Sequence, residues 1–470
     1  MAALALGVGA CLLLIAVGPA ESVAAAAKRQ AHGKSRSVAK PKVLPSEVAL
    51  PAPTASAGIG VTMAPVGLSI EYSVMAQALG SAACPPPALV AELQRLGSPP
   101  VQLGGVSQDL TVPGGALSGA PTSWETATLY PLPAAFWSQL QCLLGAAKDP
   151  LTVGLNVRTG NLSWATQMVA AAQGAASSGL SFSLGNEPDR YGVPNYASLG
   201  KALPGEEVAE ANLYLQLASY LRPAIGGAAL VGPELSQPAS WRNQLSRVVG
   251  QLHEQTVGVH MYPLTTCRSA REVTLGGLLS SKVAEAPARL AWVVSAAQAA
   301  GAPAIISEAN SASCGGLPGV SDSPAAAVWA VRFVLSALKT GFREVRFHLS
   351  GDGYDSFVVR GGQLYTRPME NALVALNQWL PVGSSLRTVS GVRELVATAI
   401  FRPAGAASML ILDNERSSSR PVVLRKARKV HISVFGARRA GPQTATLISA
   451  SGKLRLTIPA HTVVAISATP

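Results

Sequence analysis

Eight short apolar runs alternate with amphipathic segments between residues 66 and 350, and this alternation limits the folds open to the chain. The runs are VGLSIEYS (66–73), PVQLGG (100–105), LTVGLNV (151–157), LSFSLGNE (180–187), ALVGPEL (229–235), TVGVHMYP (256–263), APAIISEAN (302–310) and EVRFHLS (344–350). Segments between them, such as WATQMVAAAQGAA, repeat apolar residues at steps of three and four, as amphipathic helices do. Eight strands separated by helices predict an α/β fold, a (β/α)8 TIM barrel.

The sequence pattern changes after about Gln378, where short strand-like runs follow one another without helices. Examples are ASMLILDNE, KVHISVFG and LRLTIPAHTVVAIS, which suit an antiparallel sheet with one buried face. We therefore expect the barrel to span residues 59–378 and a C-terminal antiparallel β-sandwich domain to span residues 379–470. A strand from within residues 44–63 is a candidate additional member of the sandwich.

Residues 1–27 contain an apolar run of signal-peptide length, followed by small residues that a peptidase can cleave. An uncleaved N-terminal anchor is the alternative, because the residues before the run include no Lys or Arg. Residues 28–58 form a basic, Pro- and Ala-rich stretch that is typical of a flexible linker. We expect a secreted or periplasmic protein, or one anchored to a membrane by its N-terminus.

The chain is basic, with a formal net charge of +12, and its basic residues gather in two places. Six lie in the linker. A second cluster contains Arg425, Lys426, Arg428, Lys429, Arg438 and Arg439. One interpretation is a solvated strand and loop face, and the other is electrostatic contact with an acidic polysaccharide or a cell surface. No nucleic-acid partner is predicted.

Two glutamates stand where barrel enzymes keep their chemistry, at the C-terminal ends of strands. Glu187, in SLGNEPDR, follows the fourth apolar run, and Pro188 blocks further strand pairing. Glu308, in IISEAN, lies at the end of the seventh run. Two facing carboxylates suit a glycosidase, in which one group protonates the leaving oxygen and the other attacks the sugar or stabilises its cation. This chemistry needs no cofactor, and we predict no metal site.

Several stretches carry a resemblance to a known family. They are GLSIEYS, FSLGNEPDRYG, LVGPEL, VGVHMYPLTTC, ISEANSASCGGLPGVSDSPAAAVWAVRFV and VRFHLSGDGY. Asn-Glu-Pro at the fourth strand with a Glu at the seventh resembles clan A retaining glycoside hydrolases. The surrounding residues narrow the resemblance to glycoside hydrolase family 79, the β-glucuronidase and heparanase family. It covers roughly Ile59 to the C-terminus, including the β domain.

By this resemblance Glu187 looks like the general acid/base and Glu308 like the nucleophile, which implies a covalent glycosyl-enzyme and a retained anomeric configuration. Tyr262, at the end of the sixth strand, can keep Glu308 ionised by a hydrogen bond, and that negative charge is expected to raise the pKa of Glu187. Asn186 looks like the residue that bonds the sugar 2-hydroxyl. A turn-forming Asn is the alternative.

The resemblance also implies how a uronic acid is held. In the family, backbone amides after the nucleophile and a tyrosine after the eighth strand bind the carboxylate of glucuronic acid. The matching positions are Cys314, Gly315 and Tyr354. Gly315 allows the backbone to approach an anion closely. An ordinary glycine-rich turn and an aromatic residue on the rim are the alternatives.

The remaining matched positions are expected to bind the sugar or to support its pocket. Glu71 and Asp109 resemble acidic residues that bond sugar hydroxyls. His260 and His348 stand at the sixth and eighth strands, where the family also carries histidines. Buried, hydrogen-bonded histidines that only support the pocket are the alternative. Glu234, in VGPEL, is interpreted as structural.

Four cysteines remain after removal of the signal, an even number compatible with disulfides in an exported protein. Spacing alone does not pair them. Cys267 and Cys314 match a cysteine pair of bacterial relatives, and the resemblance therefore implies a disulfide between them. The pairing of Cys84 and Cys142 is left open.

Two departures from the family pattern affect the sugar contacts. Family members usually carry Arg-x-Gly-Gly followed by Asn, Ser or Thr after the second strand, whereas this chain has QLGGVSQD. Gln102 and Val106 thus remove a charge and a polar contact. Ser323 and Pro324 replace the usual Thr-Phe, which changes the expected edge of the pocket.

The predicted function is a secreted retaining exo-β-D-glucuronidase that removes terminal glucuronic acid from glycans or glycosides. The expected partner is a uronic-acid-containing carbohydrate substrate, and the oligomeric state is left open. An endo-acting, heparanase-like hydrolase and a clan A glycosidase for a neutral sugar are the alternatives within the same chemistry. A non-catalytic glycan-binding protein is the alternative outside it.

Overall fold

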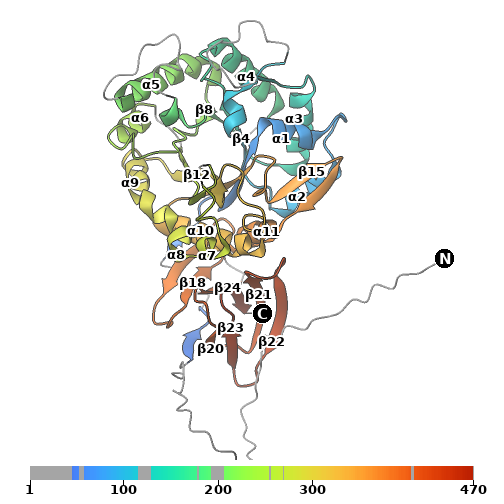
Figure 1. Cartoon of the computed structure of the whole chain (residues 1–470), viewed down its shortest axis with the longest axis vertical. Helices are drawn as coiled ribbons and strands as arrows, with labels where there is room; N and C mark the ends of the chain where they lie inside the picture. The colour runs from blue at the N-terminus through green and yellow to red at the C-terminus, as the bar shows by residue number, and fades with distance from the viewer. Residues whose placement is uncertain are drawn as a thin grey trace, which may run out of the picture.

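The computed structural model describes residues 45–51, 58–114, 129–176, 179–191, 206–252, 256–267, 269–403 and 407–468. Figure 1 shows a ring of helices around a group of strands, with a second, strand-rich unit packed below it. The predicted signal peptide or anchor (1–27) and most of the predicted linker (28–58) lie outside the described residues. Within the described ranges, no helix has the length and apolar character needed to cross a membrane.

The eight predicted barrel strands are present and form one parallel sheet. They are β3 (Val66–Glu71), β4 (Val101–Gly104), β7 (Leu151–Leu155), β8 (Leu180–Leu184), β9 (Ala229–Leu230), β10 (Val257–Met261), β12 (Ala304–Ala309) and β14 (Val345–Leu349). Neighbours pair in the order β10-β12-β14-β3-β4-β7-β8-β9. Parallel bridges from Val231 to Thr256 and from Leu235 to Val259 join the two ends. The sheet therefore closes, and the predicted barrel fold is confirmed.

Helices surround the barrel, and their buried residues recur at helical spacing. In α3 (Phe136–Ala147), for example, Phe136, Leu140 and Leu143 are buried one turn apart. The other helices are α1 (Tyr72–Leu79), α2 (Pro87–Arg95), α4 (Leu162–Ala175), α5 (Glu206–Ile225), α6 (Leu245–Leu252), α7 (Leu275–Leu278), α8 (Ser281–Ala284), α9 (Ala291–Ala299), α10 (Pro324–Thr340) and α11 (Pro368–Trp379). Short strand pairs extend the loops: β5 (Thr111–Val112) with β6 (Tyr130–Pro131), β11 (Leu264–Thr265) with β13 (Ala312–Ser313), and β15 (Phe357–Arg360) with β16 (Gln363–Thr366).

The β-sandwich consists of two sheets. A seven-stranded sheet has the order β2-β17-β18-β19-β24-β21-β22, and a three-stranded sheet has the order β1-β20-β23. The strands are β1 (Ser46–Ala49), β2 (Ile59–Gly60), β17 (Ser385–Val389), β18 (Val396–Phe401), β19 (Met409–Asn414), β20 (Arg420–Arg425), β21 (Lys429–Gly436), β22 (Gln443–Ile448), β23 (Lys453–Ile458) and β24 (Thr462–Ala468). Strands β1 and β2 come from the segment 44–63, so Ile59 and Gly60, predicted at the start of the barrel, pair with a sandwich strand instead.

The central strands β18, β19 and β24 of the seven-stranded sheet are buried on both faces. On one face Ile411, Phe435 and Val463 belong to the same core as the barrel helices. On the other face Leu412 and Ile432 pack within a separate core that also contains side chains of β20 and β23. The layers are therefore barrel, seven-stranded sheet and three-stranded sheet. Figure 1 shows the barrel above the strand-rich unit that contains both sheets.

Helix α10 joins the two domains and is buried on almost all sides. Its buried residues run nearly without interruption from Ala325 to Leu338, because barrel strands cover one side and the sandwich covers another. Arg332 of this helix is buried and forms an ion pair with buried Asp413 of β19, with nitrogen–oxygen distances of 2.6–3.0 Å. It also donates to the carbonyl oxygens of Leu279 and Asn414. This buried pair fixes the barrel to the sandwich.

The interior of the barrel contains a polar network in place of a purely apolar core. Arg346 donates to Glu344 (2.7 Å), Gln102 (2.6 Å) and Thr152 (2.9 Å). Gln102 in turn donates to Glu234 at 2.7 Å. Gln102 therefore points into the barrel, where Arg346 from β14 supplies a guanidinium. The structural interpretation of Glu234 stays a prediction.

Candidate active site

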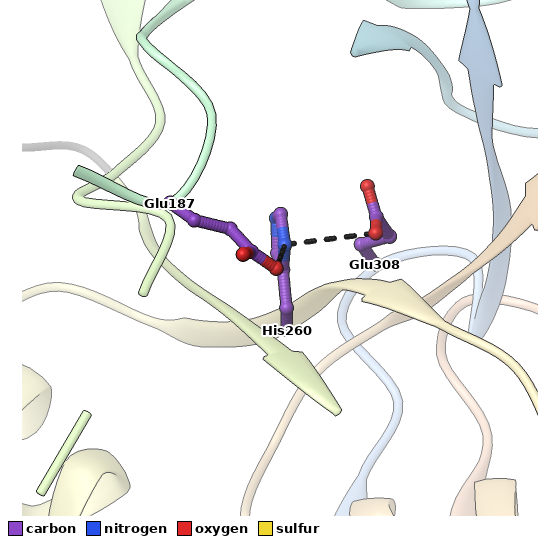
Figure 2. Close-up of side chains that lie close together, drawn as sticks. All are labelled: Glu187, His260 and Glu308. Carbon is purple, nitrogen blue, oxygen red and sulfur yellow. Dashed lines mark hydrogen bonds and ion pairs between the residues drawn. The ribbon is translucent and has the colours of Figure 1, made fainter. Parts of the chain in front are cut away.

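Glu187 is held in an unusual backbone conformation just beyond β8. Its φ of 52° lies in the left-handed region, which side chains other than Gly seldom adopt. Gly185, at φ 74°, precedes it, and a Cβ there would lie 2.5 Å from the Tyr191 hydroxyl. The short 3-10 helix η2 (Pro188–Arg190) follows. This tight turn points the Glu187 side chain towards the barrel axis, where His260 lies (Figure 2).

Two buried aspartates, Asp109 and Asp189, stabilise this turn through hydrogen bonds. Asp109 accepts hydrogen bonds from the Asn186 amide (3.1 Å) and the Tyr191 hydroxyl (2.5 Å). Asp189 accepts from the backbone amides of Ser236 and Gln237. Burial raises the pKa of Asp109 to about 7, although these hydrogen bonds oppose the rise. Asp109 thus supports the Asn186–Glu187 turn, and its predicted contact with sugar hydroxyls stays a prediction.

Glu308, on β12, faces Glu187 across His260 of β10. His260 Nδ1 lies 3.2 Å from Glu187 Oε1 and 3.7 Å from Glu308 Oε1. Figure 2 shows the imidazole between the two carboxylates, which come from different strand ends. One oxygen of each glutamate and one nitrogen of His260 all lie within 4.8 Å of one another. Retaining glycosidases have carboxyl groups about 5–5.5 Å apart and inverting ones about 6.5–9.5 Å apart, so this short separation suits retention.

Glu308 has three polar neighbours that belong to the predicted site. The Tyr262 hydroxyl donates to Glu308 Oε1 at 2.8 Å, as the sequence predicted. His348 Nδ1 lies 3.4 Å from Glu308 Oε2, opposite the side that His260 approaches. Burial raises the pKa of Tyr262, and the charge of Glu308 adds to the rise, so this phenol is a hydrogen-bond donor at all physiological pH values. Glu308 therefore accepts a hydrogen bond from Tyr262 and has a histidine nitrogen within 3.7 Å of each of its carboxylate oxygens.

The protonation of this cluster differs from the prediction made for Glu187. Burial alone would lower the pKa of His260, but the charges of Glu308 and Glu187 raise it to about 10. Burial opposes ionisation of Glu187, but the hydrogen bond and charge of His260 lower its pKa below the usual value. The expectation of a raised pKa for Glu187 is wrong for this arrangement, because an imidazolium cation at 3.2 Å outweighs the more distant carboxylate of Glu308.

Glu71 links the loop after β4 to the active site. Its carboxylate accepts hydrogen bonds from the backbone amides of Val106 (2.9 Å) and Ser107 (2.6 Å), and His348 Nε2 lies 3.3 Å from it. Burial opposes its ionisation, but His348 and Ser107 lower the pKa of Glu71 overall. The charges of Glu308 and Glu71 raise the pKa of His348 to about 9, against the effect of burial. Glu71 therefore orients His348, and its predicted sugar contact stays a prediction.

The loop predicted to hold a uronic acid carboxylate has a tightly curved backbone. Cys314, Gly315 and Gly316 have φ values of 57°, 83° and 74°, a run of left-handed residues. Disulfide Cys267–Cys314 joins this loop to the one after β10, the pairing that the family resemblance implied. A second disulfide joins Cys84 to Cys142, which settles the pairing left open.

An acidic residue missed by the sequence analysis lies against this loop. A Cβ on Gly315 would be 3.1 Å from the Asp352 Cγ, so the Asp352 carboxylate packs on the glycine. Asp352 Oδ2 accepts a hydrogen bond from the Ser350 hydroxyl at 2.9 Å. A sugar carboxylate bound by the amides of Cys314 and Gly315 would meet this negative charge nearby. The binding role of these two positions stays a prediction.

Tyr354 lies beside Tyr262 and His348, which flank Glu308. Its ring centre is 6.2 Å from that of Tyr262 and 6.1 Å from that of His348. Burial raises its pKa, so its hydroxyl is also a donor. Asp355 accepts from the backbone amides of Ser350 and Gly351 and so fixes the loop that carries Tyr354. Three of these aspartates were not singled out in the sequence analysis. Asp189 lies in the motif NEPDR, and Asp352 and Asp355 lie in GDGYDS, so their places in these motifs were the signal that could have indicated them.

Asn186 is buried, and its side-chain Oδ1 has no hydrogen-bond partner among the described residues. Its predicted bond to the sugar 2-hydroxyl stays a prediction.

One side-chain atom each of Glu187, His260 and Glu308 lies close enough to the other two for the three to hold a metal ion. A carboxylate pair performs glycoside hydrolysis without a metal, and the absence of a metal site stays a prediction.

Solved structures with a similar fold are known, although sequence comparisons find no match. Neither a protein-family model nor a curated protein sequence matches the chain. A 4-O-α-L-rhamnosyl-β-D-glucuronidase from Fusarium oxysporum matches with a TM-score of 0.69 and 19% identity, over 90% of this chain and 100% of that chain. A family 51 arabinofuranosidase from Xanthomonas axonopodis matches with a TM-score of 0.65 and 12% identity, over 90% and 100%. A family 30 endoxylanase from Clostridium papyrosolvens matches with a TM-score of 0.53 and 10% identity, over 91% and 100%. The chain thus shares the fold of clan A glycoside hydrolases.

Proposed function

We propose that this protein is a secreted, retaining exo-β-D-glucuronidase of the family 79 type, acting on terminal glucuronic acid of a glycan or glycoside. The observation that carries the hydrolase assignment is the pairing of Glu187 and Glu308 around His260, with carboxylate and imidazole atoms within 4.8 Å. Both carboxylates stand at strand C-terminal ends of one closed barrel. The two disulfides support export, because they persist in oxidising compartments.

The reaction proceeds in two displacements. Glu308 forms a bond to the anomeric carbon while the bond from that carbon to the leaving oxygen breaks, and the leaving oxygen takes a proton from Glu187. A water molecule then gives a proton back to Glu187, and its oxygen displaces Glu308 from the sugar. Each step inverts the anomeric centre, so the product retains the configuration of the substrate.

The proton for the leaving oxygen is stored on His260. His260 is protonated and Glu187 is ionised, as their opposite pKa shifts require. Their nearest atoms are 3.2 Å apart, within reach of a direct transfer. Glu187 therefore donates to the substrate after it receives the proton from His260. The pair titrates as a unit, and its loss of one proton sets the alkaline limit of activity.

Two observations support glucuronic acid as the sugar. The fold matches that of a rhamnosyl-β-D-glucuronidase over 90% of the chain. The left-handed run from Cys314 to Gly316 includes two glycines, which allow an anion to approach the backbone closely. Tyr354 lies beside this loop as a protonated phenol.

A neutral-sugar glycosidase of the same clan is the second candidate, and Asp352 favours it. Its carboxylate lies against Gly315 and would repel a sugar carboxylate at that loop. The likeness to a family 51 arabinofuranosidase is nearly as strong as that to the glucuronidase, with TM-scores of 0.65 and 0.69.

Release of nitrophenol from β-glucuronide, β-glucoside, β-galactoside and α-L-arabinofuranoside substrates separates the two candidates. The proposal predicts turnover of the glucuronide and a loss of turnover in Glu308→Gln. Activity on the neutral sugars alone would transfer the assignment to the second candidate. Product sizes from heparosan then test exo action, because an exo enzyme releases single residues.

A further inference from the structure

The β-sandwich carries most of the positive charge of the protein. Residues 379–470 contain 13 Lys and Arg against 3 Asp and Glu, a net charge of +10. Residues 59–378 contain 18 Lys and Arg against 20 Asp and Glu, a net charge of −2. The basic character of the chain therefore lies in a folded domain more than in the linker. A domain with such one-sided charge attracts anionic partners.

The structure divides the predicted basic cluster of residues 425–439 into two groups. Strand β21 separates residues 425–429 from Arg438 and Arg439, and a strand of eight residues spans about 25 Å. The cluster is thus not one continuous surface. The group at residues 425–429 gains further cations from a neighbouring turn.

Two turns pack together at this end of the sandwich. The turn between β20 and β21 meets the turn between β22 and β23 through hydrogen bonds from the Ala427 amide to the Gly452 carbonyl (2.9 Å) and from the Ser449 amide to the Arg428 carbonyl (2.7 Å). In the paired strands, Arg425 lies directly opposite Lys453. We call the exposed cations gathered here the distal basic patch: Arg425, Lys426, Arg428, Lys429, Lys453 and Arg455.

Within the described residues, carboxylates neutralise little of the charge on the distal basic patch. Glu47 of β1 forms an ion pair with Arg425. The other five cations have no ion pair with a carboxylate in the part of the chain that the structure describes. Arg425 lies directly opposite Lys453, and Glu47 offsets the charge of Arg425 in this like-charge pair. The charge left for an anionic partner to offset is that of the other five cations.

Three of the six patch cations, Arg425, Lys453 and Arg455, lie on the sheet that is farthest from the barrel, and the others lie on the adjoining turn and at the start of β21. Strands β20 and β23 belong to the three-stranded sheet, which the seven-stranded sheet separates from α10 (Figure 1). A polymer bound at the patch therefore leaves the rim of the barrel free for another part of the same or a neighbouring chain.

We propose that the distal basic patch binds an acidic polysaccharide and so keeps the enzyme on a polymer whose ends the barrel site hydrolyses. The choice of a polysaccharide rests on the proposed function, because a polymer of uronic acids carries carboxylates along its whole length. Segments 425–429 and 449–455 contain no Phe, Tyr or Trp for stacking on nucleic acid bases. They also lack the large apolar face that an interfacial membrane segment buries.

Binding of the full chain carrying Glu308→Gln to heparosan, measured at low and at physiological ionic strength, tests the proposal. The triple variant Arg428→Gln, Lys429→Gln, Lys453→Gln in this background is expected to bind at least about tenfold more weakly at low ionic strength, with a smaller salt dependence. The matched control replaces Lys148, Lys282 and Arg289, three exposed barrel cations, with Gln and should bind within about twofold of the parent.

With Glu308 intact, the patch variant should hydrolyse a nitrophenyl β-glucuronide at the parent rate, because the substitutions lie outside the barrel. Equal weakening by the patch and control variants would overturn the proposal, as would equal binding to duplex DNA or phosphatidylserine vesicles at the same salt. Binding through the patch without hydrolysis of any β-glucuronide would reject the proposed function and leave the binding surface standing.

Discussion

The barrel and the sandwich use charged residues in opposite ways. In the barrel, Arg346 and Glu344 are buried in a hydrogen-bonded network, and Glu187, His260 and Glu308 form a tight cluster at the rim. In the sandwich, the cations of the distal basic patch lie in solvent. Burying a charge costs free energy unless it is paired, and in the barrel the Arg346 network and the rim cluster supply such partners. The barrel cluster is a site for chemistry, whereas the sandwich patch is a surface that attracts anions. The predictions below test the barrel cluster and the buried ion pair that joins the two domains.

The largest effect is expected from Glu308→Gln. Loss of the nucleophilic carboxylate should lower kcat at least about 10³-fold, while the isosteric amide leaves the fold intact. Steady-state kinetics and a thermal melt measure both. The control Glu394→Gln removes an exposed carboxylate of the sandwich and should leave kcat unchanged. Equal losses in the two variants would contradict a special role for the barrel carboxylate.

Glu187→Ala should slow substrates according to their leaving groups. Poor leaving groups need a proton and should lose about 10²–10⁴-fold in rate, whereas an activated nitrophenyl leaving group should lose much less. Azide should restore turnover and yield a glycosyl azide, because a small anion can enter the space left by the side chain. Uniform slowing of good and poor leaving groups would argue against the acid/base role.

Arg332→Met tests the buried pair that joins the domains. The change leaves Asp413 buried without its partner, which should cost about 3–5 kcal/mol of unfolding free energy. Adding Asp413→Leu removes the unpaired buried charge and should recover much of the lost unfolding free energy. Denaturant unfolding monitors both variants. An unchanged stability for Arg332→Met would show that the junction depends on apolar contacts alone.

His260→Asn should move the alkaline limit of activity to lower pH. In the parent, the proton shared with Glu187 is lost only as pH rises through the raised pKa of His260, about 10. Without His260, Glu187 holds that proton alone and loses it at lower pH, by at least about one pH unit. The pH profile of kcat/KM measures the shift. An alkaline limb that stays in place would show that His260 only supports the pocket.

The smallest effect concerns metal ions. Removing metals with EDTA should leave glycosidase activity unchanged, because two carboxylates suffice for the reaction. Added Zn²⁺ should inhibit reversibly, because the clustered ligand atoms of Glu187, His260 and Glu308 suit this cation. Loss of activity in EDTA that Zn²⁺ restores would contradict the proposed metal-free chemistry.

The regular part of the fold follows from local patterns in the sequence. The eight barrel strands could be predicted because each is a short apolar run next to a helical period. Their common C-terminal rim then brings Glu187 and Glu308 to one end of the barrel. The contact from Tyr262 to Glu308 could be predicted for the same reason, since both residues end neighbouring strands.

Contacts set by tertiary structure could not be predicted in this way. The position of Asp109 beneath Asn186, 77 residues apart, depends on how two loops pack. Asp352 meets Gly315 through a loop conformation that no periodicity encodes. The lowered pKa of Glu187 depends on the distance of His260, which a sequence does not state. The splitting of the basic cluster required the length and direction of β21.

The first-formed anomer of the released sugar tests the central claim most directly. Proton NMR during hydrolysis of a β-glucuronide should show the β-anomer before mutarotation, because carboxylates this close leave no room for a water to attack from the opposite face. Appearance of the α-anomer first would mean inversion, and Glu187 and Glu308 would then not act across the sugar as their geometry implies.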